Sequence, residues 1–471
     1  MFARFAPVIL MTGLMTVGAE QAQIADPFEV IAAFDHVAEM DLWPGFEATA
    51  FPIAVYDGDR TLLLRHPSPP ADFVPLEGHD GVWVSPGKHP AMRWNSNADI
   101  GGVRTATLLL TIEPGRPVEY EAHILFHEVF HLFSKPLHPT WRPNEIYRYS
   151  YPMADLDNYR LQLLEEEAMA RAVESQTGEA TASWAAAALE IRRERMARLS
   201  NEHRAFEIAL ELQEGTAVYM GRSTIGVAAD TEGLREVRGP EEIRWRGYET
   251  GAAIAVLLDR LLPSWKEVLD AEPDTTLAAL LSAALAAREG TLAAFTDEEQ
   301  AAFTHQAGVA ITELAAERAA LYEDFAGRTN RVVIRLADKN EYMEVSRFDP
   351  MAVEVLNRGE ALQAHVLSAS HSRGELSLNN PHFVRRSLGG VIALTIPAGD
   401  HPFLDGFRVV SVAGFSGGPT VVREGDIITV TAEGLSAAFD GALVESTDEE
   451  LIITIPPAEL DEQSPVVNSQ E

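Results

Sequence analysis

Two histidines and a glutamate in the segment ILFHEVFHLF (124–133) have the spacing of a metal site. His127 and His131 are four residues apart, so on a helix they lie on one face, one turn apart. Both imidazoles can therefore reach one metal ion. Glu128 lies about 100° further round the helix, within reach of a water bound to the metal. In metal-assisted hydrolysis the metal acidifies that water and a carboxylate accepts its proton, so Glu128 is the predicted general base.

The residues around the two histidines are apolar, which predicts a helix that is buried nearly all round. They are Ile124, Leu125, Phe126, Val129, Phe130, Leu132 and Phe133. Burying Glu128 and two histidines without partners costs several kcal/mol, and a metal ion would satisfy all three. The alternative interpretation is a core helix whose histidines bond to the backbone. His123 continues the same stripe one turn earlier, and we expect it to have a structural or supporting role.

A catalytic zinc ion usually takes three protein ligands and keeps one position for water. The chain has no cysteine, so the ligands must be histidine and carboxylate. No third histidine follows at short spacing, which leaves a glutamate on a later helix. Glu165, in LQLLEEEAMARA, is one candidate, because it shares a helix face with Leu161, Ala168 and Ala172.

Glu214, in ELQEGTAVYMG, is the second candidate, at the edge of an apolar stripe. The next residue is Gly215, which costs about 1 kcal/mol inside a helix. We expect that glycine to allow close packing against the helix that carries the histidines. From the residues alone, both glutamates remain open as the third ligand.

The two fragments HEVFH and QEGTAVY together resemble the gluzincins, zinc peptidases with an HExxH helix and a glutamate as third ligand. The resemblance implies a zincin-like fold, His127 and His131 as zinc ligands, Glu128 as general base and Glu214 as third ligand. The segment 45–290 is also similar to an uncharacterised group of secreted bacterial proteins, through fragments such as LEEEAMARA and RGYETGAAIAVLLDRL, and this likeness brings no substrate.

Two departures from the gluzincin pattern stand out. Gln213 replaces the usual asparagine, and Glu214 follows His131 by 83 residues (214 − 131), so a helical insert must fill the gap. Zinc peptidases also need a donor for the oxyanion. Five side chains are available, and Tyr248 is favoured because a glycine and alanines follow it and allow close approach: Tyr147, Tyr151, His203, Tyr219 and Tyr248.

The pattern along the chain predicts an α+β protein. The segment 103–113 is β-branched and apolar and predicts a strand, whose edge a substrate chain could pair with. The helix that follows it is expected to end at Pro136. Helical periodicity continues from about 155 to 327, and strand and turn patterns follow.

These patterns predict four segments. Residues 1–19 form a signal peptide with Arg4 before a short apolar run, and 20–329 form the zincin-like hydrolase domain, mixed α/β to about 115 and then mainly helical. Residues 330–460 form a smaller β-rich, sandwich-like domain, and 461–471 a disordered tail. The protein is thus expected to be exported to a periplasm or the extracellular space, without stable membrane insertion after signal cleavage.

The charge composition limits the partners. There are 71 acidic and 37 basic residues, a net charge of -34, which excludes a nucleic-acid footprint.

The histidine motif and the resemblance together predict a zinc-dependent hydrolase, a metallopeptidase acting on a peptide or protein. The alternative is a catalytically inactive, zinc-stabilised binding or scaffold protein. The sequence does not indicate an oligomeric state.

Overall fold

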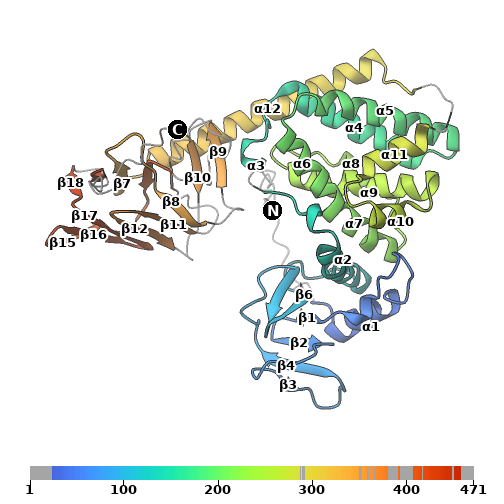
Figure 1. The fold of residues 1–471 in the computed structure, drawn as a ribbon, viewed down its shortest axis with the longest axis horizontal. Helices are drawn as coiled ribbons and strands as arrows, with labels where there is room; N and C mark the ends of the chain where they lie inside the picture. Colours follow the sequence, from blue (N-terminus) through green and yellow to red (C-terminus); the bar gives the residue numbers. More distant parts are fainter. Residues whose placement is uncertain are drawn as a thin grey trace, which may run out of the picture. The chain divides into compact units, whose positions relative to one another are not determined.

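The computed structural model describes most of the chain and confirms the α+β class (Figure 1). The predicted signal segment 1–19 and tail 461–471 lie outside the described residues. The residues that the structure describes are 24–145, 147–286, 288, 292–348, 353–357, 360–363, 366–379, 391–392, 407–415, 417–447 and 450–457.

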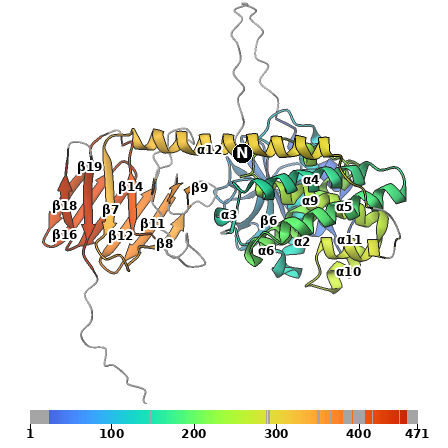
Figure 2. The ribbon, with the colours of Figure 1, turned by 90° about the horizontal axis from the view of Figure 1, so that it is seen from above.

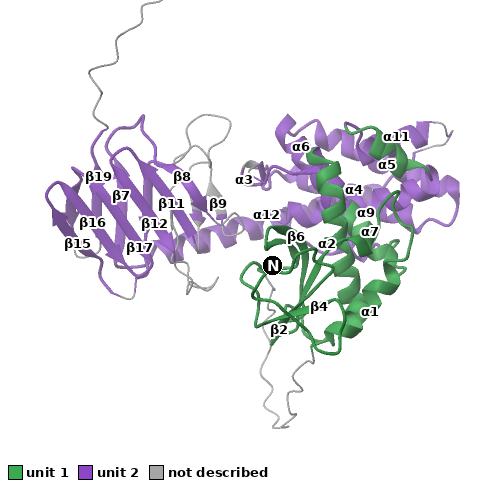
Figure 3. Ribbon diagram, turned by 60° about the horizontal axis from the view of Figure 1, so that its bottom comes forward, with its two compact units in different colours: residues 1–139, 216–230, 264–273 green, residues 140–215, 231–263, 274–471 purple. Residues whose placement is uncertain are grey.

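The chain divides into two compact units that alternate along the sequence (Figure 3). Unit 1 contains 1–139, 216–230 and 264–273, and unit 2 contains 140–215, 231–263 and 274–471. The change from helix to strand falls between the end of α12 at Ala326 and the start of β7 at Arg331. The division of the chain into domains at 329 stays a prediction.

The described part of unit 1 contains a six-stranded sheet in the order β3-β4-β2-β1-β6-β5. Its strands are β1 (Ile53–Tyr56), β2 (Arg60–Leu64), β3 (Val74–Pro75), β4 (Val82–Pro86), β5 (Ser96–Ile100) and β6 (Val103–Leu109). β6 runs parallel to β1 and antiparallel to β5. The predicted strand 103–113 therefore ends early and has no open edge, because β5 covers it. The edge that a substrate could pair with belongs to β5.

The helix with the two histidines is α2 (Val118–Leu137), which packs on β6 and β5. Leu125, Phe126, Val129 and Phe130 on it are fully buried. Pro136 lies in the last turn and does not end the helix, which continues to Leu137. Unit 1 also contains α1 (Pro27–Val37), η1 (Ala48–Ala50), α7 (Thr216–Thr224) and α10 (Trp265–Ala271). In the described part of the chain, no helix combines the length and the apolar character that a membrane span requires.

The helices of unit 2 begin after η2 (Pro139–Trp141), and the two longest neighbours in sequence, α4 and α5, pack along each other. They are α3 (Tyr147–Ser150), α4 (Leu156–Glu174), α5 (Gly178–Met196), α6 (Asn201–Leu210), η3 (Glu211–Gly215), α8 (Glu232–Arg235), α9 (Ile243–Leu261), α11 (Leu277–Ala286) and α12 (Asp297–Ala326). The element η3 is a π-helical turn. It joins α6 to α7 without a break, so the chain is helical from Asn201 to Thr224.

The strands after α12 form two sheets that face each other (Figure 2). Within the described residues one has the order β18-β19-β7-β14-β13-β10-β9 and the other β15-β16-β17-β12-β11-β8. Alternate residues of both sheets, such as Ile334 of β7 and Val430 of β16, meet in one core. The strands are β7 (Arg331–Leu336), β8 (Glu344–Phe348), β9 (Val353–Asn357), β10 (Glu360–Gln363), β11 (Val366–His371), β12 (Gly374–Asn379), β13 (Val391–Ile392), β14 (Val409–Val412), β15 (Thr420–Glu424), β16 (Ile427–Ala432), β17 (Leu435–Asp440), β18 (Leu443–Ser446) and β19 (Glu450–Ile455).

Candidate metal centre

The two histidines of α2 point their ring nitrogens at one place. Nε2 of His127 and Nε2 of His131 are 3.1 Å apart, and the rings are nearly perpendicular, at 89°. Two imidazoles that bind one tetrahedral zinc ion with bonds of about 2.0–2.1 Å have nitrogens about 3.3 Å apart. His131 is buried and His127 is half-buried. The His127 side of the pair therefore keeps part of its surface accessible.

Glu214 completes a group of three possible ligands. One ligand atom each of His127, His131 and Glu214 lies within 4.8 Å of the other two. Glu214 lies in η3, two residues before the start of α7, and α7 packs on α2 inside unit 1. Gly221 makes this packing close, because a Cβ there would lie 3.0 Å from the carbonyl oxygen of His123 and 3.5 Å from Cβ of His127. Two imidazoles and one carboxylate are a donor set that suits zinc.

Gly215 serves a different contact from the predicted one. A Cβ on Gly215 would lie 2.5 Å from Cα of Gly251 and 3.0 Å from the carbonyl oxygen of Gly247, both on α9. The glycine therefore allows η3 to pack against α9. The close approach to α2 that we expected from Gly215 is made by Gly221 instead.

The Glu214 carboxylate has several polar neighbours. Its Oε1 accepts hydrogen bonds from Nη2 of Arg244 at 3.0 Å and from Nε2 of Gln213 at 2.9 Å. Arg244 also donates through Nη1 to Glu145 and through Nη2 to the hydroxyl of Tyr248, at 3.2 Å. The guanidinium of Arg244 thus places a positive charge beside the Glu214 carboxylate and orients it.

Tyr248 lies beside the candidate third ligand. Burial, and then the negative charge of Glu214, raise the pKa of the Tyr248 hydroxyl, so it remains a protonated donor at neutral pH. Two of the other oxyanion candidates have partners elsewhere. The hydroxyl of Tyr219 accepts from Nζ of Lys266 at 2.9 Å, and that of Tyr151 donates to Glu207 at 2.5 Å.

The two remaining oxyanion candidates pack against each other. The ring of Tyr147 contacts the ring of His203, with centroids 6.4 Å apart. Burial lowers the pKa of His203. Tyr248, by contrast, forms a side-chain hydrogen bond with Glu214, a member of the His-His-Glu group.

Glu165 has arginine partners and is not part of the His-His-Glu group. It is fully buried, with ion pairs to Arg192 at 2.9 Å, Arg195 at 2.7 Å and Arg246 at 3.1 Å. Burial alone would raise the pKa of its carboxyl, but the three guanidinium groups outweigh burial and hold that pKa well below its usual range. The prediction that a carboxylate on this apolar face needs a partner is met by arginine.

Glu128 and His123 flank the first histidine on α2. Glu128 is buried, and its backbone oxygen accepts a hydrogen bond at 2.8 Å from Nδ2 of Asn97 on the edge strand β5. His123 pairs through Nδ1 with the carbonyl oxygen of Tyr120 at 2.6 Å. Burial lowers the pKa of His123 to about 4, so it is neutral at pH 7 and supports the contact with α7.

Three polar residues of this region escaped the sequence analysis: Asn97, Glu145 and Arg244. Arg244 precedes Tyr248 by four residues in RWRGYETG, so the two share a helix face, and that spacing was the available signal. Asn97 and Glu145 lie outside helices, and their spacing in the sequence carries no such information.

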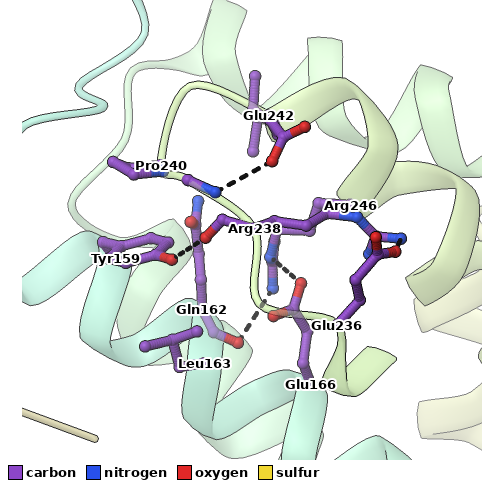
Figure 4. A pocket seen from close by; sticks show the side chains of 11 residues that line it. Tyr159, Gln162, Leu163, Glu166, Glu236, Arg238, Pro240, Glu242 and Arg246 are labelled. Atoms are coloured by element: carbon purple, nitrogen blue, oxygen red, sulfur yellow. Dashed lines mark hydrogen bonds and ion pairs between the residues drawn. The ribbon is translucent and has the colours of Figure 1, made fainter. Parts of the chain in front are cut away.

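A small pocket in unit 2 contains none of the predicted site residues (Figure 4). Arg246 closes one side, where its Nε is 2.8 Å from Oε1 of Glu166. Burial and then the charge of Glu165 raise the pKa of Glu166 to about 7, against the opposing effect of Arg246. The lining also includes Tyr159, whose hydroxyl donates to the backbone oxygen of Arg238.

Comparisons of this chain with protein-family models, with curated proteins and with solved structures found no match. The likeness to the gluzincins therefore rests on the fragments HEVFH and QEGTAVY, and the function must be argued from the chemistry of the site.

Proposed function

We propose that this protein is an exported zinc-dependent hydrolase, specifically a metallopeptidase of the zincin type. The observation that carries the proposal is the group formed by His127, His131 and Glu214, with ligand atoms within 4.8 Å of one another. Glu128 follows the first histidine on the same helix. A zinc ion held there would polarise the scissile carbonyl and acidify a bound water.

In the proposed reaction the chain's own residues bind the substrate and move protons. Glu128 accepts the proton of the attacking water on its carboxylate and transfers it to the leaving amine. Tyr248 keeps its hydroxyl proton and donates a hydrogen bond to the developing oxyanion. The Glu214 carboxylate is oriented by Arg244 and Gln213, which donate to its Oε1.

A peptide substrate is favoured by the edge strand β5. Its second residue, Asn97, donates to the backbone of Glu128, which ties the open edge of the sheet to the helix that carries the proposed base. An extended peptide can add to such an edge through backbone hydrogen bonds.

The first test is the metal content of the purified mature protein, measured by elemental analysis. We expect about one zinc ion per chain, in line with a three-ligand catalytic site. His131→Ala should lose the zinc, whereas His305→Ala, which removes an exposed histidine of α12, should keep it. A protein that binds no zinc even when zinc is supplied would refute the proposal.

The second test separates an enzyme from a zinc-stabilised scaffold. The wild-type protein should cleave members of a library of internally quenched peptides, and Glu128→Gln should retain zinc but lose cleavage. Equal cleavage by Glu128→Gln would refute the assigned base. Zinc without cleavage of any peptide would favour the scaffold.

A further inference from the structure

Six charged side chains of unit 2 form what we call the buried ion network. Each is at most 5 % exposed, and three negative charges balance three positive ones. The members come from α4, α5, α6, η3 and α9: Glu165, Arg192, Arg195, Glu207, Glu211 and Arg246. Two of them, Glu207 and Glu211, lie on the helix of Glu214, seven and three residues before it.

The pairs in the network are bidentate. Arg192 donates to both carboxylate oxygens of Glu211, at 2.7 and 2.5 Å. Arg195 donates to both oxygens of Glu207, at 2.7 Å each. Thr250 of α9 donates through Oγ1 to Oε1 of Glu211 at 2.7 Å. The Glu211 carboxylate is therefore held from α5 and from α9, and its direction is fixed.

Stability alone does not account for such a network. The free energy of desolvating six charged groups can exceed the free energy gained from their mutual attraction. Apolar residues of similar volume often stabilise a protein as well or better. Where buried ion pairs are retained, the best attested use is to fix one geometry. The geometry at stake here is that of η3, because Glu211 is its first residue.

The π-helical turn separates two glutamates that an α-helix would keep together. Residues three apart on an α-helix lie within about 60° of each other. In η3 the wider turn rotates Glu214 further from Glu211, so that Glu211 enters the network while Glu214 joins the histidines. Such turns are rare and occur frequently at functional sites. The π-helical turn thus lets these two carboxylates serve different partners.

We propose that Arg192 and Glu211 are positioning residues for the metal ligand: their ion pair, with Thr250, holds η3 in its π-helical form and so presents Glu214 to the metal. This inference rests on the proposed metal site. The network contributes no ligand itself and acts through the backbone of residues 211–215.

The test replaces the pair by apolar residues of similar length, in R192M/E211M. The protein should stay folded with a somewhat lower unfolding temperature. One positive and one negative charge leave the network together, and Glu165, which loses Arg192, keeps Arg195 and Arg246. Its dissociation constant for zinc should rise about tenfold or more, the usual effect of losing support for a ligand. The visible spectrum of the cobalt-substituted protein should also change, because the ligand geometry changes.

The matched control is R193M/E190M. It removes an ion pair of the same type from the same helix, but this pair is exposed to solvent. Zinc affinity and the cobalt spectrum should remain those of the wild type. Thr250→Val is a milder variant that removes only one hydrogen bond to Glu211, and it should weaken zinc binding several-fold even if R192M/E211M does not fold.

The outcomes separate this inference from the proposed function. If the wild type binds zinc and folded Thr250→Val and R192M/E211M bind it equally well, with an unchanged cobalt spectrum, the positioning role is refuted and the metal site stands. If the wild type binds no zinc, both proposals fall.

Discussion

Gly215 and Gly251 meet backbone to backbone. A Cβ on Gly251 would lie 2.6 Å from the carbonyl oxygen of Glu211 and 2.8 Å from Cα of Gly215. No side chain at either position can be accommodated without moving a helix, because the nearest atoms are backbone. The position of η3 against α9 is therefore set by the absence of two side chains, one residue after the candidate third ligand.

Gly251→Ala should push η3 away from α9. We expect a loss of about 1–3 kcal/mol in the free energy of unfolding, the usual effect of overpacking, and weaker zinc binding. Gly308→Ala on α12 is the control, because a Cβ there meets no atom within 4 Å. It should leave zinc affinity unchanged and raise stability by up to about 1 kcal/mol, because alanine favours helices. Thermal unfolding and zinc titration measure both effects, and an unaltered Gly251→Ala protein would contradict the packing argument.

Glu214→Ala and Glu165→Ala should lose different properties, zinc binding in the first variant and stability in the second. Glu214→Ala should fold and lose its zinc. Glu165→Ala leaves three arginines without one of their carboxylates, and we expect it to cost about 3–5 kcal/mol of stability. Zinc content and unfolding midpoints of the two variants separate the roles. A folded Glu165→Ala protein that lacks zinc would transfer the third ligand to Glu165.

Tyr248→Phe should lower kcat by about 10²–10³, the usual effect of removing an oxyanion donor, while zinc content stays the same. KM should change little, because the hydroxyl acts on charge that develops only in the transition state. Tyr219→Phe is the control, since it removes a hydroxyl whose donor is Lys266. An equal loss of kcat in both variants would show that the effect of Tyr248 is structural.

Stability should fall with rising pH because of Glu121, in the first turn of α2. Burial raises the pKa of its carboxyl from 4.5 to about 7, with Arg116 opposing and Glu113 adding to the shift. The folded state prefers the neutral form, so this contribution is complete below about pH 4.5 and is lost as the pH rises through about 7.

Glu121→Gln should therefore match the wild type near pH 4.5 and exceed it at pH 8. We expect a gain of on the order of 1–3 kcal/mol, because the raised pKa means that the folded protein disfavours the charged carboxyl. Denaturant unfolding at several pH values measures it. Glu119→Gln, at an exposed position of the same turn, should follow the wild type. A Glu121→Gln protein with the wild-type pH dependence would contradict this assignment.

The sequence predicted best the helices and strands whose secondary structure follows from the pattern of their own residues. The apolar periodicity around His127 and His131 predicted α2, and the β-branched run in 103–109 predicted β6. Strand β5 was missed because its sequence, SNADI, has low strand propensity and is held by its pairing with β6. Pro136 predicts a helix end at that residue, but the last turn of α2 tolerates it.

The setting of the candidate site was less predictable, because it depends on contacts between distant segments. Arg192, Arg193 and Arg195 lie in one run, IRRERM, which reads as an exposed helix face. In the structure Arg193 is exposed, whereas Arg192 and Arg195 are buried against glutamates of other helices. No local pattern distinguishes the three. A π-helical turn likewise has no sequence signal that the residues 211–215 could have supplied.

The buried ion network also orders the events of folding. Its charges come from segments as far apart as Glu165 and Arg246, so any intermediate that lacks one helix must leave a charge without its partner in a dry interior. Such intermediates are raised in free energy, which favours joint packing of the five elements that carry the network. The direction of Glu214, three residues after Glu211, depends on that packing. On the proposed function, a chain in which these helices have not yet packed has two histidines but no complete metal site, so only the folded protein can bind the metal.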